Sequence, residues 1–113
     1  MPKVSNDTKL KDVIMEMSTK RLGAVAVVDD HERLLGIITD GDLRRMLENN
    51  MDLSKSTAQD IMTADPKALE KGDYATKALN TMQQNNIAQL VVLDNLKVVG
   101  FVHLHDLLKE GIV

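Results

Sequence analysis

The hydrophobic pattern of the first 50 residues changes its period along the chain. Four apolar side chains recur at the spacing i, i+3, i+4, i+7 that marks one face of a helix: Leu10, Val13, Ile14 and Met17. Two runs rich in Val, Leu and Ile follow, "AVAVVD" from Ala24 and "RLLGIIT" from Arg33, and both end at turn-forming or polar residues, as buried strands do. The polar "DLRRMLEN" from Asp42 then predicts a second helix.

The same pattern occurs again when the sequence is shifted by 65 residues. The face of the first helix then falls on Ala75, Ala78, Leu79 and Met82. The first strand falls on "QLVVLD", Gln89 to Asp94. Thr8 falls on Asp73, and both are predicted N-caps of the helices that follow.

One turn in the second copy is a residue shorter, so the shift becomes 64 for the rest of the repeat. "KVVGFVH" from Lys97 is the equivalent strand, Gly36 meets Gly100, and Asp42 meets Asp106 at the start of "DLLKEG". Each half is therefore predicted as helix–strand–strand–helix, in an α/β (α+β) fold.

A polar segment separates the two halves. Residues 51–56 are predicted as a linker between a first motif at 1–50 and a second at 57–113. Thr57-x-x-Asp60 resembles a capping box for one helical turn, and Asp65-Pro66 ends it. "KALE" is predicted to add a short strand to the second half, where the first half has only "PKVSN". The counterpart of residues 57–65 would precede Met1, so a longer parent protein is expected.

Composition narrows the class of protein. Hydrophobic residues make up 43% and charged residues 27% of the 113, as in ordinary globular domains. No cysteine is present, which excludes disulfides and thiolate metal sites and fits the cytoplasm. A net charge of −3 and only two aromatic residues argue against nucleic-acid binding. No segment has the roughly 20 apolar residues of a membrane span, and no signal-peptide core is seen.

Neither half, at about 50 residues, would bury enough surface alone. We therefore expect two similar sheets packed face to face about a pseudo-twofold axis, with a cleft along that axis.

The duplicated pattern, the Gly-x-x-Thr-x-x-Asp of Gly36–Asp42 and the "DIMTADP" at 60–66 resemble a CBS-domain pair, or Bateman module. More narrowly, "RLGAVAVVDDHERLLGIITDGDLRRML" and "GFVHLHDLLKEGIV" resemble the C-terminal part of arabinose-5-phosphate isomerases. In that family a sugar-isomerase domain comes first and interconverts ribulose 5-phosphate and arabinose 5-phosphate for lipopolysaccharide synthesis. The resemblance implies a missing N-terminal isomerase domain.

Thr39 and Asp42 have two compatible interpretations. They are spaced as a capping box, or the carboxylate accepts ribose hydroxyls while the hydroxyl and the helix N-terminus meet a phosphate. The resemblance favours the second, because these positions contact ribose and phosphate in CBS pairs. Arg44 and Arg45 differ by about 100° around the helix, so only one of them is expected to reach a phosphate.

The second half departs from this pattern. Asp106 is kept, but His103 stands where the first half has Thr39, and His105 follows it. Either imidazole could bind a phosphate or carboxylate, more strongly when protonated. Alternatively His103 ends a strand and His105 faces solvent. A metal site of His103, His105 and Asp106 is disfavoured, because residues so close in sequence diverge.

Three residues of each half lie just before or at the start of its first strand: Leu22, Gly23 and Ala24, matched by Ile87, Ala88 and Gln89. They either allow tight packing or, as the resemblance implies, admit a base between the aliphatic walls of Leu22 and Ile87.

Three hypotheses follow for function. Catalysis is rejected, since no nucleophile elbow, phosphate loop or triad is visible. A regulatory module would sense a nucleotide or a cytidine-monophosphate-activated sugar, with no cofactor or metal, and an adenine nucleotide is the runner-up ligand. His103 or His105 would meet the carboxylate of the CMP-sugar. A structural module would only dimerise the parent enzyme. A homodimer is expected through two apolar helix faces, although the same residues could instead be intramolecular core: Leu43, Met46 and Leu47, and Leu107, Leu108 and Ile112.

Overall fold

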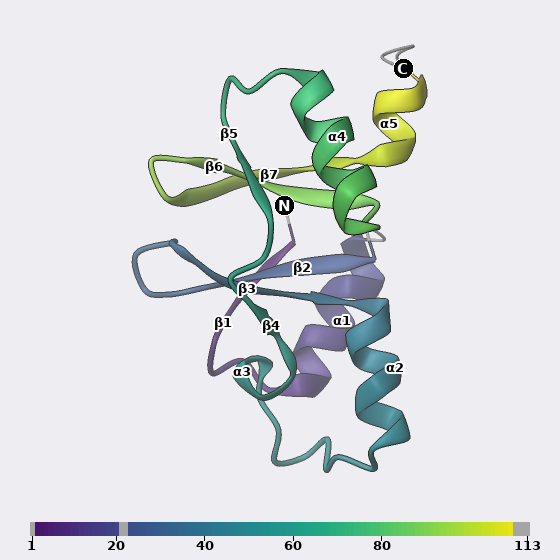
Figure 1. The fold of residues 1–113 in the computed structure, drawn as a ribbon. Helices are drawn as coiled ribbons and strands as arrows, with labels where there is room; N and C mark the ends of the chain where they lie inside the picture. Colours follow the sequence, from purple (N-terminus) through teal and green to yellow (C-terminus); the bar gives the residue numbers. More distant parts are fainter. Residues whose placement is uncertain (1, 21–22, 110–113) are drawn as a thin grey trace. The chain divides into compact units, whose positions relative to one another are not determined.

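The computed structural model describes residues 2–20 and 23–109 (Figure 1). The chain forms two compact units, Met1–Pro66 and Lys67–Val113, and each is considered by itself. The sequence-based boundaries at residues 50 and 57 stay a prediction.

The first unit is a four-stranded mixed sheet with three helices. Its strands are β1 (Lys3–Ser5), β2 (Ala24–Val28), β3 (Leu34–Thr39) and β4 (Thr63–Ala64), in the order β1-β2-β3-β4. Its helices are α1 (Leu10–Lys20), α2 (Asp40–Glu48) and α3 (Ala58–Ile61). Strand β1 is parallel to β2, and the other neighbours are antiparallel. In Figure 1, α1 and α2 lie on the same side of this sheet.

The core of the first unit lies between the sheet and its helices. Leu10, Val13 and Met17 of α1 are buried together with Val25 and Val27 of β2. Ile14, at the edge of the predicted helix face, is half-buried. The 3.6-residue period of the sequence therefore found the buried face of α1, because a helix can bury one stripe only.

Within its described residues, the second unit repeats this arrangement with one strand fewer. It contains β5 (Ala68–Glu70), α4 (Ala75–Asn85), β6 (Gln89–Asp94), β7 (Lys97–His103) and α5 (Leu104–Lys109), with sheet order β5-β6-β7. Its core is formed by Leu69, Ala78, Met82, Leu90 and Leu107. "KALE" supplies β5, parallel to β6, and "PKVSN" supplies the equivalent β1, so the predicted short strand is confirmed.

Strand register confirms the repeat residue by residue. Ala24 pairs with Thr39 in the first sheet, and Gln89 pairs with His103 in the second. The register shifts at Val27/Val28 and again at the equivalent Val92/Leu93. His103 therefore occupies the backbone position of Thr39.

The helix starts differ from the prediction. Helix α2 begins at Asp40 rather than Asp42, and α5 begins at Leu104 rather than Asp106. Asp73 is not the N-cap of α4; that position is Tyr74. The Asp73 carboxylate instead accepts the backbone N–H of Glu70 at 2.8 Å, and the Thr8 hydroxyl accepts that of Ser5 at 3.1 Å. Both side chains hold the turn between a strand and the next helix.

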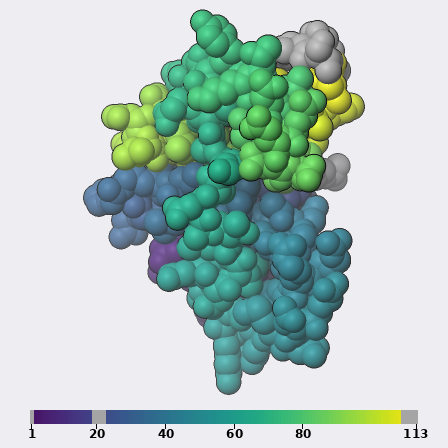
Figure 2. Space-filling model, in the orientation of Figure 1, coloured from purple at the N-terminus to yellow at the C-terminus, as the bar shows by residue number. Residues whose placement is uncertain are grey.

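The segment between α2 and β4 has two parts. Residues 52–55 are exposed, and Figure 2 shows the segment's teal atoms at the surface. Residues 56–59 instead bond to the start of the chain, where the N–H of Ala58 donates to the carbonyl of Thr8 at 2.8 Å. The predicted capping box of α3 is confirmed, with the Asp60 carboxylate accepting the N–H of Thr57 at 2.8 Å.

Gly36 is needed for β4 to lie beside β3. A Cβ on Gly36 would be 2.7 Å from the carbonyl oxygen of Thr63 and 2.7 Å from Sδ of Met62. Only glycine leaves room for that approach. Among the helices of the described residues, none has the length and apolar character to cross a membrane.

Candidate functional site

Thr39 and Asp42 form a capping box at the junction of β3 and α2. The Thr39 hydroxyl accepts the N–H of Asp42 at 3.4 Å, and Asp42 Oδ2 accepts the N–H of Thr39 at 2.9 Å. The capping interpretation is therefore confirmed. The box holds the carboxylate at one place on the first turn of the helix.

Asp42 is a buried carboxylate with four donors. Its side chain is 6% exposed. Oδ2 accepts the N–H of Thr39 and also the Thr39 hydroxyl at 3.2 Å. Oδ1 accepts the Thr63 hydroxyl at 3.3 Å and Nη2 of Arg45. A carboxylate offers about four lone-pair sites, so all of them are occupied.

Arg45 is the arginine beside this carboxylate. It forms an ion pair with Asp42 while its side chain stays 58% exposed. Arg44 points elsewhere: its side chain is 73% exposed, and its Nε lies 4.0 Å from Oε1 of Glu48. The prediction that only one of the two arginines faces the site is consistent with this arrangement.

Thr63 was not singled out from the sequence. It belongs to the "DIMTADP" stretch and follows Asp42 by 21 residues, so no helical or strand period links the two. The pairing of Ile37 with Thr63 brings β4 to the edge of β3 and the Thr63 hydroxyl to Asp42.

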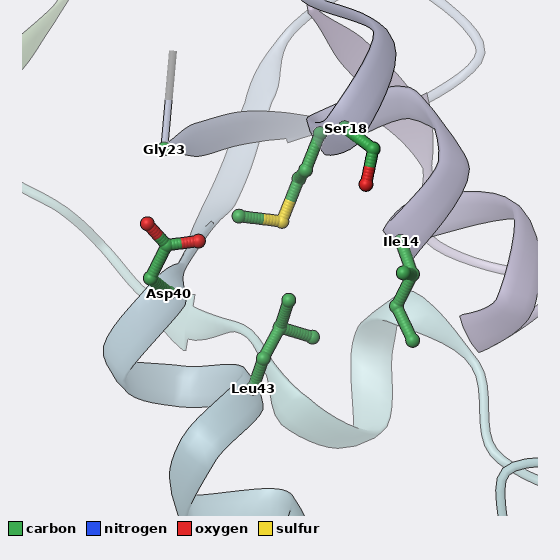
Figure 3. A pocket seen from close by; sticks show the side chains of 6 residues that line it. Ile14, Ser18, Gly23, Asp40 and Leu43 are labelled. Carbon is green, nitrogen blue, oxygen red and sulfur yellow. The ribbon is translucent and has the colours of Figure 1, made fainter. Parts of the chain in front are cut away.

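A pocket of about 250 Å³ lies between α1 and the start of α2 (Figure 3). Its lining is Ile14, Met17, Ser18, Gly23, Asp40 and Leu43. In Figure 3, Asp40 lies beside Gly23, while Ile14 and Ser18 come from the opposite side. Asp40 was also not singled out from the sequence, because the helix was predicted to begin at Asp42 and not at Asp40.

A second pocket, of about 210 Å³, lies beside α2 and α3. Its lining is Asp42, Arg45, Met46, Asn49, Met51, Asp60 and Ile61. The ion pair of Asp42 and Arg45 therefore borders open space within the first unit. The Asp60 carboxylate in this pocket is held by its bonds to Thr57.

The residues before the first strand of each repeat join that strand to the later helix. The carbonyl of Gly23 accepts the N–H of Asp40 at 3.3 Å, and the carbonyl of Ala88 accepts that of Leu104 at 2.7 Å. Gly23 has φ of +70°. Ala24 is buried in β2, Ile87 packs against the second core, and Gln89 pairs with His103. Leu22 lies outside the described residues. These contacts account for tight packing, and a role toward a base stays a prediction.

The equivalent junction of the second unit has other chemistry. Nδ1 of His103 accepts the N–H of His105 at 3.2 Å. His105 and Asp106 are exposed. Within residues 2–20 and 23–109, no group of three or more His, Asp or Glu side chains is arranged to hold a metal ion.

The helix faces proposed for self-association are partly core. Met46 is buried in the first core and Leu107 in the second, and Leu43 packs against the first core. This part of the predicted dimer face is wrong, because these side chains cover their own sheets. Leu47 and Leu108 are exposed, and Ile112 lies outside the described residues.

Comparison with known proteins gives consistent results. The family model of the CBS domain matches residues 1–49 and 58–112. The arabinose 5-phosphate isomerase KdsD of Yersinia pestis is 39% identical over 113 residues, which are 100% of this chain and 34% of that protein. The enzyme of the same name from Pseudomonas aeruginosa is 40% identical over 114 residues, 100% of this chain and 35% of that protein. The chain thus spans about a third of the length of these relatives.

A solved structure shows the same fold. The CBS domain protein PAE2072 from Pyrobaculum aerophilum, complexed with AMP, superposes with a TM-score of 0.86. It is 22% identical, and the match covers 94% of this chain and 82% of that one.

Proposed function

Because the chain belongs to the CBS domain family and contains two copies of its motif, we propose that it is the regulatory part of a sugar-phosphate isomerase. The relatives named as arabinose 5-phosphate isomerases are about three times longer, so the isomerase chemistry is assigned to the remainder of the parent protein. CBS domains are regulatory, and the proposal places no catalytic step in this chain.

The ligand is proposed to be a nucleotide or a CMP-activated sugar. The observation that supports this is the grouping of a hydroxyl, a carboxylate and a guanidinium, from Thr39, Asp42 and Arg45, at the start of α2. A carboxylate suits the vicinal hydroxyls of a ribose, and an arginine fork suits a phosphate. The AMP carried by the Pyrobaculum aerophilum protein has both groups.

A CMP-activated octulosonate is the ligand that would link binding to the parent pathway. It would carry the ribose and phosphate and also a sugar carboxylate, for which His103 and His105 are the candidate partners. If it binds one state of the module better than another, it shifts the attached isomerase by linkage and acts as a feedback inhibitor.

Calorimetry of the purified chain with the CMP-sugar, CMP, AMP and ATP tests this proposal. We expect the CMP-sugar to bind most tightly. Tighter binding of AMP or ATP would leave an adenylate sensor, and no binding at millimolar concentration would leave a structural role.

Asp42→Asn and Asp106→Asn form a matched pair for the same measurement. The first should lose the charge-assisted bonds of a buried carboxylate, about 1.5–3 kcal/mol of binding. The second should change nucleotide binding much less, because Asp106 is exposed and lacks the Thr partner. Equal losses would contradict the assignment to the first unit.

A homodimer is the second candidate function. Met15 of α1 and Leu47 of α2 are exposed apolar side chains on helices of the same unit. Met15→Lys with Leu47→Lys should shift a dimer to monomer in sedimentation equilibrium. A 12.5 kDa species of the unmodified chain at high micromolar concentration would rule the dimer out.

A further inference from the structure

We propose that Arg45 determines the ligand specificity of this site. Its guanidinium occupies the Asp42 carboxylate and so prevents ligands that lack a phosphate from bonding to it. The inference rests on the proposed nucleotide-binding function and adds a means of selection to it. In this structure, the guanidinium bonds to the carboxylate that the proposed function assigns to a ribose. A phosphate on the ligand gives the guanidinium another anion and so opens the carboxylate.

The first step is the saturation of Asp42. Thr39 supplies two donors to Oδ2, and Thr63 and Arg45 supply one each to Oδ1. A ligand hydroxyl that donates to this carboxylate must therefore replace a donor already present.

The second step is the unequal mobility of these donors. The bonds to Oδ2 come from the backbone and side chain of Thr39, and they cap α2. The bonds to Oδ1 come from the ends of two exposed side chains, Thr63 and Arg45. Hydroxyl groups would therefore enter at Oδ1, where a side chain can rotate away without uncapping the helix.

The third step is charge. A neutral hydroxyl that displaces Arg45 leaves a buried carboxylate without its cation, which is unfavourable. A nucleoside has no anionic group to pair with the displaced guanidinium. A nucleoside monophosphate has a dianionic phosphate that matches the guanidinium fork. The pocket of about 210 Å³ that both residues line gives the guanidinium room to move.

Asp60 is the other carboxylate lining this pocket and so the competing anion for a displaced Arg45. It already accepts the N–H of Thr57 at 2.8 Å and the Thr57 hydroxyl at 3.3 Å. Its negative charge also disfavours a phosphate deeper in the pocket. The phosphate is therefore expected on the solvent side of Arg45.

The test compares Arg45→Met with the matched control Arg44→Met. Both remove a guanidinium from α2, but Arg44 pairs only with the exposed Glu48 in the described structure. Calorimetry of each whole chain uses AMP and CMP against adenosine and cytidine. Circular dichroism checks that each variant is folded, and Arg45→Lys serves as a second variant that keeps the charge.

The two ligand classes should respond in opposite directions. Arg45→Met should weaken the binding of AMP and CMP roughly ten- to a hundredfold, which corresponds to the loss of one charge-assisted bond. The same substitution should strengthen the binding of adenosine and cytidine. Arg44→Met should leave the affinity for nucleotides and for nucleosides unchanged. Arg45→Lys should fall between the wild type and Arg45→Met for both classes.

If Arg45→Met weakened the binding of nucleotides and nucleosides alike, the proposed selection by Arg45 (the gate) would be overturned. The proposed nucleotide-binding function would remain in place. No change in either class would have the same two consequences. If nothing binds to the wild type or to Arg45→Met, the proposed function fails along with the gate. Nucleoside binding that appears only in Arg45→Met would support the gate.

Discussion

The two repeats share a register but differ at the junction of their last strand and helix. In the first, Thr39 and a buried Asp42 form a closed network with Thr63 and Arg45. In the second, the His103 side chain accepts the N–H of His105, and Asp106 is exposed. Duplication therefore kept the backbone, which the shared hydrophobic pattern specifies, while the polar groups at the junction diverged.

The two equivalent glycines show the same divergence in packing. Gly36 is crowded by Met62 and Thr63, whereas a Cβ on Gly100 would meet no described atom within 4 Å beyond its two chain neighbours. The first sheet has a fourth strand at this edge, and the described second sheet ends at β7.

Alanine at the two glycines should give the largest contrast. Gly36→Ala should destabilise the protein by about 3 kcal/mol, the upper end for overpacking, because the backbone of Thr63 cannot move aside cheaply. Gly100→Ala should be neutral or stabilising by about 0.5 kcal/mol, since glycine is unfavourable within a strand. Urea unfolding measures both, and equal effects would refute the packing argument.

The two aspartates should differ next. Asp42→Ala removes a helix cap and an acceptor of four bonds, and we expect a loss of about 2 kcal/mol. Asp106→Ala changes an exposed side chain and should stay within about 0.5 kcal/mol. Thermal and urea unfolding of the pair decide this, and a loss at Asp106 as large as at Asp42 would show that the second junction is also closed.

Substitutions in the turns of the two hairpins should differ less in their effects on stability. Asn95 and Leu96 both have positive φ, 54° and 73°, in the two-residue turn between Asp94 and Lys97. Such a turn favours Asn-Gly, so Leu96→Gly should raise the stability by about 1 kcal/mol. Glu32→Gly, at φ of 66° in the first hairpin, should gain less because Glu32 also pairs with Lys3. A lower melting temperature of Leu96→Gly would contradict the strain at this position.

Acid should act on one of the two strand–helix turns. The backbone N–H at the first turn is accepted by the Thr8 hydroxyl, and the equivalent N–H at the second turn is accepted by the Asp73 carboxylate. The N–H of Glu70, aided by the ammonium of Lys77, lowers the pKa of the Asp73 carboxyl below its usual value. The folded state therefore binds this proton less well than the unfolded chain, so the stabilisation is full above about pH 4 and is lost as pH falls further.

Asp73→Thr copies the first turn into the second and tests that pH dependence. The melting temperature of the wild type should fall more steeply than that of the variant between pH 5 and pH 3, approximate bounds around the usual aspartate pKa. Parallel curves would show that Asp73 contributes no acid sensitivity.

The contacts of the site that join residues close in sequence could be predicted from the spacing of those residues. Thr39 and Asp42 are three residues apart, and a capping box needs nothing beyond the first turn of its own helix. The same holds for Thr57 and Asp60. The predicted caps Thr8 and Asp73 were misassigned because Ser, Thr and Asp side chains bond equally well to a preceding turn, and their identity does not select the direction.

By itself, the sequence determined the duplication, the order of the main helices and strands and the buried face of α1. These depend on period and on neighbours within a few residues. Only the tertiary structure decided that Thr63 reaches Asp42 across 21 residues, that Gly36 accommodates β4, and that Met46 and Leu107 belong to their own cores. Such contacts depend on which strand edge and which helix face the folded chain brings together. A hydrophobic pattern specifies that a face is buried, but it does not specify which element covers that face.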